Sequence, residues 1–249
     1  MKLASLKGGR DGRLVVVSDD LAWFAGAAHI APTLQAALDD WGRCEGALRN
    51  LATDLEHGVI PKDRFHEREA AAPLPRLYGR VDSPASVLAA RDAIALGGEC
   101  SFAAGVVVVT GDVQAGASVE DARAAIRLVG LVNDLSLGGF DGDFQSKPAS
   151  AYSPVFVTPD ALGAHWDGRR MIGPVRADVN GTALEQADAA QDFGALIAAA
   201  AHTRGLGAGT VLGAGWVAAA SLKTGDTVRI WMEDERRHSI FGAIEQTMG

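Results

Sequence analysis

The sequence predicts an α+β domain built on a strongly curved sheet. Short apolar runs rich in β-branched residues recur in the second half of the chain, at 106–109, 155–157 and 228–231. Glycine supplies 30 of the 249 residues, which indicates many turns and close approaches of the backbone. Few segments show helical spacing. Short strands joined by glycine-rich turns, with a few inserted helices, are typical of this fold class.

Each element is expected from a local pattern. A first strand is predicted at 14–17, after a turn signal at 8–12. Thr33 can cap a helix over 33–49, and a second short helix is predicted over 51–58. The polar, proline-punctuated stretch 61–75 is expected to be a surface connector. Two more helices are predicted at 118–131, where Ser118 can cap and acids fill the first turn, and at 192–204.

Composition excludes several classes of protein. The formal net charge is −8, which argues against binding to nucleic acid or to an anionic membrane surface. No apolar run has the length of a membrane helix, and the first residues do not resemble a signal peptide, so we expect a cytoplasmic protein. Cys44 and Cys100 predict buried thiols in a reducing compartment, and no motif spaced like a zinc site occurs.

Segments in the same order along most of the chain resemble a known family. They include 1–4 with 14–18, Ala31-Pro32-Thr33-Leu34, Val109-Thr110-Gly111-Asp112, Val132-Asn133-Asp134, Phe144-Gln145-Ser146-Lys147-Pro148 and 239–246. Together they are similar to the fumarylacetoacetate hydrolase family in its bacterial form. The resemblance implies an α+β fold with a curved mixed sheet, or β-roll. It also implies two domains, a small N-terminal one at 1–75 and a catalytic-type one at 76–249.

The resemblance also implies a chemistry. Such proteins cleave or rearrange carbon–carbon bonds of 2-oxo and β-diketo acids, using Mg²⁺ or Ca²⁺ to hold the oxo-enolate. Two glutamates on one strand face, separated by one residue, share the ion with the aspartate of the Val-Asn-Asp segment. A further acid and a histidine base lie upstream, in a segment that also carries a lid.

The sequence departs from that pattern at the metal site. Counting back from Thr110, the two glutamate positions fall on Ala103 and Gly105, while the aspartate is kept as Asp134. The segment with the base and lid is missing after residue 82. One carboxylate does not hold Mg²⁺ well, so we expect no metal and no other cofactor. Trp216 stands in a predicted turn, where the family has a small hydroxyl.

Each candidate site residue has a possible functional role and a purely structural alternative. Lys147 can bind a carboxylate or enolate, or be a structural partner of Asp134. Asp134 can be an acid/base group, or a structural acid held by Lys147. Gln145 can donate a hydrogen bond to a substrate oxygen, or bond within the sheet edge. The resemblance also places Tyr78, Trp216, Ala103 and Gly105 as substrate-lining residues, with packing as the alternative for Tyr78 and Trp216.

Two functions remain open at this point. The first is a divergent, metal-independent enzyme acting on a small 2-oxo, β-keto or enolisable acid, by hydrolase, lyase or isomerase chemistry. The second is a non-catalytic paralogue that binds a ligand or serves as the partner of an active family member. The resemblance also implies a homodimer.

Overall fold

The computed structural model describes the chain except residues 78, 81–85, 96–99, 140–145 and 186–188, and the side chains of 80 and 214–216. The helices and 3₁₀ turns are α1 (Leu34–Asp39), α2 (Trp41–His57), η1 (Glu67–Glu69), α3 (Val119–Ala124), η2 (Pro159–His165) and α5 (Phe193–Ala200). The strands are β1 (Lys2–Leu6), β2 (Arg13–Val17), β3 (Trp23–Gly26), β4 (Asp63–Arg64), β5 (Gly79–Arg80), β6 (Ser86–Leu88), β7 (Cys100–Thr110), β8 (Ile126–Leu137), β9 (Ala149–Tyr152), β10 (Phe156–Val157), β11 (Arg176–Val179), β12 (Thr182–Ala183), β13 (Thr210–Leu222), β14 (Thr227–Trp231) and β15 (Ile244–Thr247).

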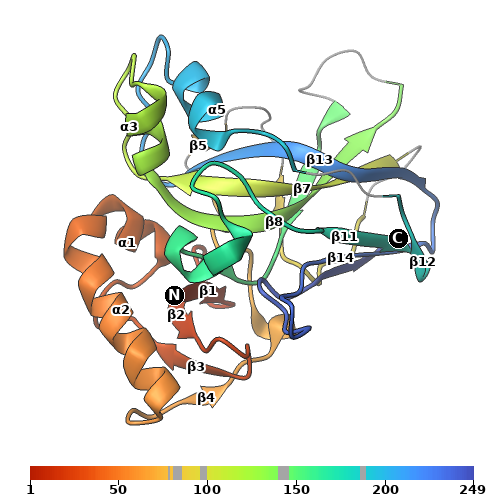
Figure 1. The fold of residues 1–249 in the computed structure, drawn as a ribbon. Coiled ribbons are helices and arrows are strands. Elements are labelled where there is room, and N and C mark those ends of the chain that lie inside the picture. The colour runs from red at the N-terminus through yellow and green to blue at the C-terminus, as the bar shows by residue number, and fades with distance from the viewer. Residues whose placement is uncertain (78, 81–85, 96–99, 140–145, 186–188) are drawn as a thin grey trace.

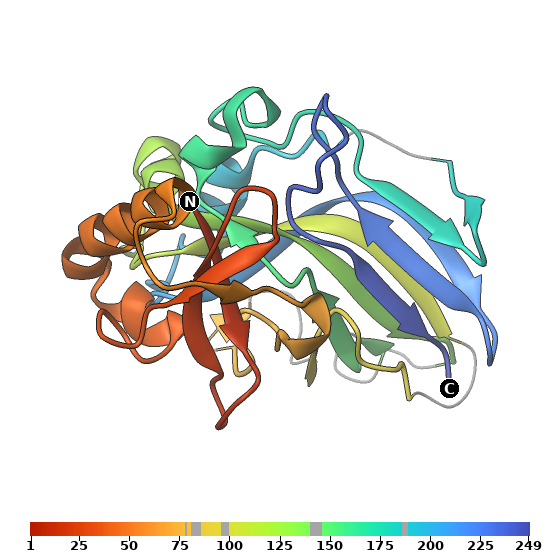
Figure 2. The same ribbon diagram turned by 90° about the horizontal axis from the view of Figure 1, so that it is seen from below.

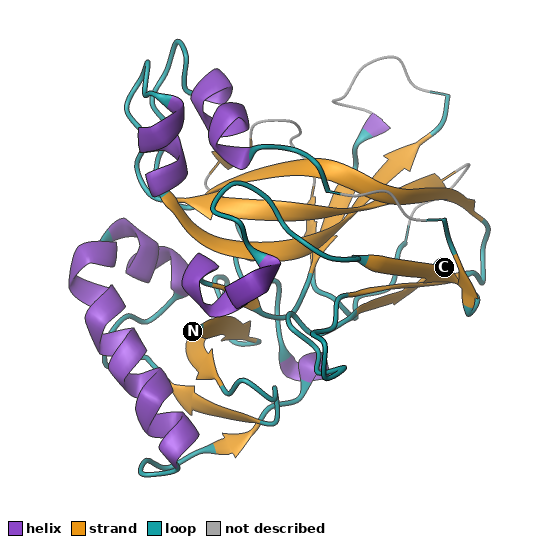
Figure 3. Cartoon of the chain, in the orientation of Figure 1, coloured by secondary structure: helices purple, strands orange, loops and turns teal. Residues whose placement is uncertain are grey.

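The described strands form two sheets. The larger has the order β4-β3-β2-β1-β10-β8-β7-β13-β5, with β9 added beside β8 and β6 beside β9. The smaller has the order β12-β11-β14-β15 and lies under the long strands β7, β8 and β13 in Figure 1. Helices α1 and α2 cover the N-terminal strands, and α3 packs beside α5 at one end of the long strands (Figures 1 and 3). The sequence prediction of an α+β fold with a curved mixed sheet is confirmed.

One continuous sheet links the N-terminal strands to the rest of the chain. Strand β1 pairs with β10, with Leu3 opposite Phe156, and β10 pairs with β8. Seen from below in Figure 2, the N-terminal strands continue into the long strands. A shared apolar core supports the junction, because Leu3, Phe156 and Leu128 are all buried in one cluster. The division at residue 75 stays a prediction, and the ladder runs across it.

The expected helix at 118–131 is wrong beyond its first half. Ser118 does cap α3, accepting a hydrogen bond from the Asp121 amide, but α3 ends at Ala124. From Ile126 the chain is the strand β8, buried along most of its length. Residues 126–132 are apolar on both faces of the chain apart from Arg127, which suits a central strand better than a helix with one apolar stripe. Gly130 lies in this strand because a Cβ there would overlap the Phe156 ring.

The N-terminal helices also differ from the expected boundaries. Thr33 caps α1 as predicted, but the helix stops at Asp39 and a new one begins at Trp41. The predicted helix at 51–58 is therefore not separate: it is the second half of α2, which ends at Gly58 in the left-handed conformation (φ 68°). The strands expected at 14–17, 106–109 and 228–231 are confirmed. Among the described residues, no helix combines the length and hydropathy that crossing a membrane requires.

Candidate functional site

Asp134 is a buried carboxylate in the middle of the larger sheet. It lies directly opposite Ala103 of β7 and opposite Ser150 of β9, so these three side chains share one face of the sheet. Only 1% of Asp134 is exposed. Because an isolated buried charge is costly, this carboxylate requires partners within the protein.

Two neighbours supply those partners. The Lys147 ammonium donates to Asp134 Oδ2 at 2.5 Å, and the Ser150 hydroxyl donates to Oδ1 at 2.5 Å. The Lys147 side chain is 25% exposed, so one end of the pair reaches the surface. The arrangement presents a cation at the edge of a buried carboxylate, which is a combination that can bind an anionic oxygen.

The opposite face of the same strands faces the smaller sheet. Asn133, next to Asp134, points the opposite way and donates to Gln246 of β15 at 2.8 Å. The Asn133–Gln246 bond ties the smaller sheet to the larger one, and Gln246 also donates to the Asp92 carbonyl in the segment before β7. The face that carries Asp134 is therefore directed away from the smaller sheet.

The described side chains do not fit the divalent cation that the family resemblance implies. Both oxygens of Asp134 already accept hydrogen bonds, one of them from an ammonium group. Ala103 and Gly105, on the facing strand, have no ligand atoms in their side chains. Within the described part of the chain, no three His, Cys, Asp or Glu side chains gather as a metal site would require.

The structure brings together only some of the predicted site residues. Ala103, Asp134 and Lys147 meet at one place, and Gly105 lies two residues further along β7, opposite Val132. Gln145, Tyr78 and the side chain of Trp216 lie outside the described residues. The segment 213–217 is not the predicted turn: it belongs to β13, whose pairing with β7 shifts between Ala214 and Ala218.

Sequence reasoning missed Ser150. Its hydroxyl completes the partners of Asp134, and its position follows from the pairing of β9 with β8. A signal was present, because Ser150 follows Lys147 by three residues and lies in the short strand β9. Without the register between the two strands, however, nothing in the sequence places Ser150 opposite Asp134.

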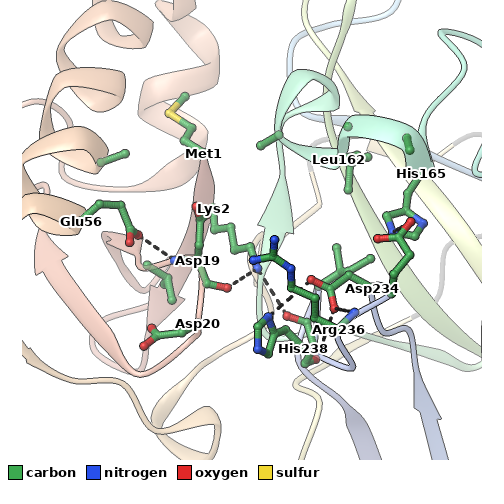
Figure 4. Close-up of a pocket in the computed structure, with 18 of the residues that line it drawn as sticks. Met1, Lys2, Asp19, Asp20, Glu56, Leu162, His165, Asp234, Arg236 and His238 are labelled. Atoms are coloured by element: carbon green, nitrogen blue, oxygen red, sulfur yellow. Dashed lines mark hydrogen bonds and ion pairs between the residues drawn. The ribbon is translucent and has the colours of Figure 1, made fainter.

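A second feature is a cavity of about 900 Å³, whose lining includes neither Asp134 nor Lys147. It lies between the N-terminal segment and residues 234–240, which follow β14 and are called here the C-terminal hairpin, and Figure 4 shows Lys2 reaching across it. The Lys2 ammonium donates to the Asp19 carbonyl at 2.8 Å and to the Ser239 carbonyl at 3.4 Å. Lys2 thereby connects the loop after β2 to the segment after β14.

The charges around this cavity are mixed. Burial lowers the pKa of Lys2, and the carboxylates of Asp19, Asp234 and Glu56 oppose that shift. Glu56 is itself bonded to the Asp19 amide, and Asp234 to the amides of Arg236 and His238. These contacts give Lys2 and its neighbours a structural role in holding the hairpin.

Comparisons with known proteins agree with this architecture. The sequence matches the family described as fumarylacetoacetate (FAA) hydrolase C-terminal over residues 55–248, and fumarylacetoacetase N-terminal domain 2 over residues 1–76. No curated protein matches the chain.

Solved structures share the whole fold at low sequence identity. Maleylpyruvate hydrolase from Sphingobium sp. SYK-6 is 17% identical, with 100% of both chains covered and a TM-score of 0.77. Fumarylacetoacetate hydrolase from the psychrophilic Exiguobacterium antarcticum is 14% identical, with 100% of this chain and 99% of that chain covered and a TM-score of 0.73. A probable 2-hydroxyhepta-2,4-diene-1,7-dioate isomerase from Mycobacterium abscessus is 16% identical, with coverage of 100% and 98% and a TM-score of 0.69.

The structural similarity to these proteins establishes the fold. The family match covers most of the chain, residues 55–248. The N-terminal unit is consistent with the match over residues 1–76. The chain belongs to the fumarylacetoacetate hydrolase family.

Proposed function

We propose that this protein is an enzyme that acts on a small 2-oxo, β-keto or otherwise enolisable acid without a divalent cation. The observation that carries the proposal is the Lys147–Asp134 pair, set on a sheet face where Ala103 stands opposite the carboxylate. Support for the substrate class comes from the relatives, which include a hydrolase of maleylpyruvate and an isomerase of an unsaturated hydroxy diacid. The maleylpyruvate hydrolase was also solved with manganese(II) and pyruvate, so the metal-free part of the proposal concerns this chain alone.

The hydrolase, lyase and isomerase reactions of such acids share an enolate, which C–C cleavage or proton removal produces. In its interconversion with the keto acid, a proton leaves the carbon next to the ketone, the electron pair of that C–H bond becomes the C=C bond, and the π pair of the C=O bond moves to the oxygen. The Lys147 ammonium stabilises the negative oxygen, since it has three N–H donors and can contact a ligand while bound to Asp134. Asp134 orients Lys147 and is the candidate proton acceptor, with Gln145 as a further candidate donor to the substrate.

Formation of this enolate can be measured without knowing the final product. Purified protein is treated with EDTA, and exchange of the C3 protons of 2-oxobutanoate with D₂O is followed by ¹H NMR. We expect exchange above the protein-free rate, with a loss of about 100-fold in Lys147→Ala because general acid and electrostatic contributions have that size. Asp134→Asn separates the two roles of Asp134, because an amide can still orient Lys147 but cannot accept the proton.

A matched control is Lys223→Ala, which removes an exposed lysine on the turn between β13 and β14. The proposal is wrong if exchange is absent, if it appears only after Mg²⁺ or Mn²⁺ is added, or if Lys147→Ala and Lys223→Ala behave alike.

One observation favours the second function, a non-catalytic member of the family. Both oxygens of Asp134 are bonded to protein groups, which is the arrangement of a structural acid. In that case the same NMR samples show binding of 2-oxobutanoate, or of an active family member added as a partner, without any C3 exchange.

A further inference from the structure

The cavity beside β1 has a buried ammonium group in its wall. Lys2 is only 7% exposed, and its side chain lines the cavity of about 900 Å³ shown in Figure 4. An ammonium has three N–H donors. Backbone carbonyls accept from two of them, that of Asp19 at 2.8 Å and that of Ser239 at the longer distance of 3.4 Å. Lys2 therefore keeps donor capacity for a further partner.

The charge of Lys2 is not matched by a direct neighbour. A buried charge normally has a partner of opposite charge, but among the described residues no carboxylate forms an ion pair with this ammonium. Asp19, Asp234 and Glu56 act on it from longer distances, and burial still lowers the pKa of Lys2. An anion bound in the cavity would supply the missing negative charge.

A second cation of the same cavity also lacks a partner. Arg236 is an exposed residue of the C-terminal hairpin that lines the cavity, and its guanidinium forms no hydrogen bond or ion pair within the described part of the chain. Lys2 reaches the cavity from β1 and Arg236 from the hairpin (Figure 4). Arg49 differs from both, because Glu45 and Asp160 already bind its guanidinium. Two cations are thus available to one anionic group.

The carboxylates of the lining do not cancel this attraction. Three of them already accept hydrogen bonds from neighbouring groups of the chain: Asp20, Glu56 and Asp234. The other two, Asp19 and Glu235, are exposed, so water screens them. The least solvated charge of the cavity is therefore the positive charge of Lys2.

The remaining wall of the cavity is largely apolar. Met1, Val17, Leu162 and Ile240 are buried residues that line it, and Ala52 adds a small side chain from α2. A cavity of this volume, with apolar walls and a few polar groups that fix orientation, is typical of sites for small molecules. The polar groups select the head of the ligand, and the apolar wall selects its body.

We infer that this cavity binds a small monocarboxylate with an apolar body, its carboxylate at Lys2 and Arg236 and its body against the apolar wall. The site is separate from the proposed active site, since its lining includes neither Asp134 nor Lys147. Its walls come from the N-terminal segment and from the C-terminal hairpin, so the bound acid also holds these two parts of the chain together.

Hexanoate is the probe, and calorimetry on the full chain measures its affinity. Three compounds serve as comparisons: acetate has the head without the body, hexan-1-ol has the body without the charge, and hexylammonium has the opposite charge. We expect hexanoate to bind at least about tenfold more tightly than each of them. A hydrogen bond to a charged group and the burial of an alkyl chain are each worth about that factor.

Three variants locate the binding. Lys2→Met keeps the length and the apolar stem of the side chain but removes the charge, so hexanoate should bind about tenfold more weakly and no better than hexan-1-ol. Lys2 also holds two backbone carbonyls, so two further variants test the cavity without touching those bonds. Arg236→Gln should weaken hexanoate about threefold. Ala52→Phe fills the cavity from α2 and should abolish binding of hexanoate and hexan-1-ol alike.

Two matched controls lie outside the cavity. Lys223→Met removes an exposed lysine, and Arg237→Gln removes the arginine next to Arg236, which does not line the cavity. Both should bind hexanoate as the unaltered protein does. Lys147→Ala should also keep the affinity, which distinguishes this cavity from the proposed active site.

Several results would overturn the inference. These are no binding of hexanoate, equally tight binding of acetate, hexan-1-ol or hexylammonium, and unchanged binding in Ala52→Phe. Equal losses in Arg236→Gln and Arg237→Gln would also do so. A loss of hexanoate binding in Lys147→Ala would place the acid at the proposed active site instead, and C3 exchange tests that site independently.

Discussion

Ala103 lies directly opposite Asp134 across the β7–β8 ladder, so a methyl group faces the buried carboxylate of the site. The neighbour of Asp134 on its other side is Ser150, which donates to it. The carboxylate is therefore bonded to a hydroxyl and an ammonium, and its strand partner contributes nothing polar. Because Ala103 supplies no ligand atom opposite Asp134, a substitution at Ala103 can test whether a missing carboxylate explains the expected loss of the metal site.

Ala103→Glu places a second carboxylate opposite Asp134, on a strand about 4.8 Å away. Two carboxylates on one face are the start of a divalent site, so we expect measurable binding of Mn²⁺ by calorimetry in the variant and none in the unaltered protein. Ala219→Glu is the control, because Ala219 lies on the same row but one strand further from Asp134. Equal Mn²⁺ binding by both variants would contradict this account of the site.

The Asp134–Lys147 pair predicts a strong coupling in stability. Lys147→Met leaves a buried carboxylate without its cation, and we expect a loss of about 3 kcal/mol in the free energy of unfolding. Asp134→Leu with Lys147→Met removes both charges and should recover much of that loss. Urea unfolding of the single and double variants gives the coupling energy. Additive effects would mean that the two groups do not stabilise each other.

Asp160 predicts a dependence of stability on acid pH. Arg49 of α2 donates to both carboxylate oxygens of Asp160 in η2, at 2.7 and 3.0 Å, and this bonding holds the pKa of Asp160 well below its ordinary value of 3.8. A lowered carboxyl pKa contributes stability that is present above the ordinary value and is lost as the pH falls further. Because the pair is about half exposed, the contribution is about 0.5 kcal/mol.

Asp160→Asn should therefore unfold at lower urea concentration than the unaltered protein at pH 7. The difference should shrink as the pH falls below about 3.8. Asp39→Asn, an exposed carboxylate on α1, serves as a control for the general effect of charge. A difference between Asp160→Asn and the unaltered protein that stays constant down to low pH would contradict the linkage to Arg49.

The lack of space at Gly130 predicts that a larger residue there lowers stability, and that a smaller residue at Phe156 restores part of it. A methyl group at this position in β8 overlaps the ring of Phe156 in β10, so Gly130→Ala should lower the free energy of unfolding by about 2 kcal/mol. That loss corresponds to a melting temperature lower by about 4–8 °C for a chain of this size. Combining Gly130→Ala with Phe156→Leu gives the methyl group room, so the two losses should be less than additive. Strict additivity would show that the ring is not the obstacle.

The sequence predicts some parts of this protein better than others, for physical reasons. The fold class and the strand at 106–109 follow from local runs of β-branched residues. The helix at 118–131 fails because a good cap at Ser118 marks where a helix begins but not where it ends, and β8 is defined by burial on both faces. The broken helix at Asp40 is likewise set by tertiary packing of Leu38 and Trp41, which are both buried.

In the candidate site too, some residues could be predicted from local sequence and others could not. Counting along β7 located Ala103 and Gly105 on one face, and the retained motif pointed to Asp134 and Lys147. The place of Ser150 depends on which residue of β9 lies opposite Asp134 of β8. Strand register is fixed by contacts between distant parts of the chain, so a single sequence without an alignment does not contain it in readable form.

The pairing of β1 with β10 has a consequence for how this chain can be handled. A fragment starting near residue 76 would lose β1 and leave the amide and carbonyl groups of Phe156 and Val157 as an open sheet edge. Leu128 of β8, which is buried in one cluster with Leu3, would lose part of its apolar cover. An open edge flanked by apolar side chains is a template for pairing with other molecules, so such a fragment should aggregate where the full chain stays dispersed. We therefore expect the N-terminal strand to protect this edge of the sheet from pairing with other molecules.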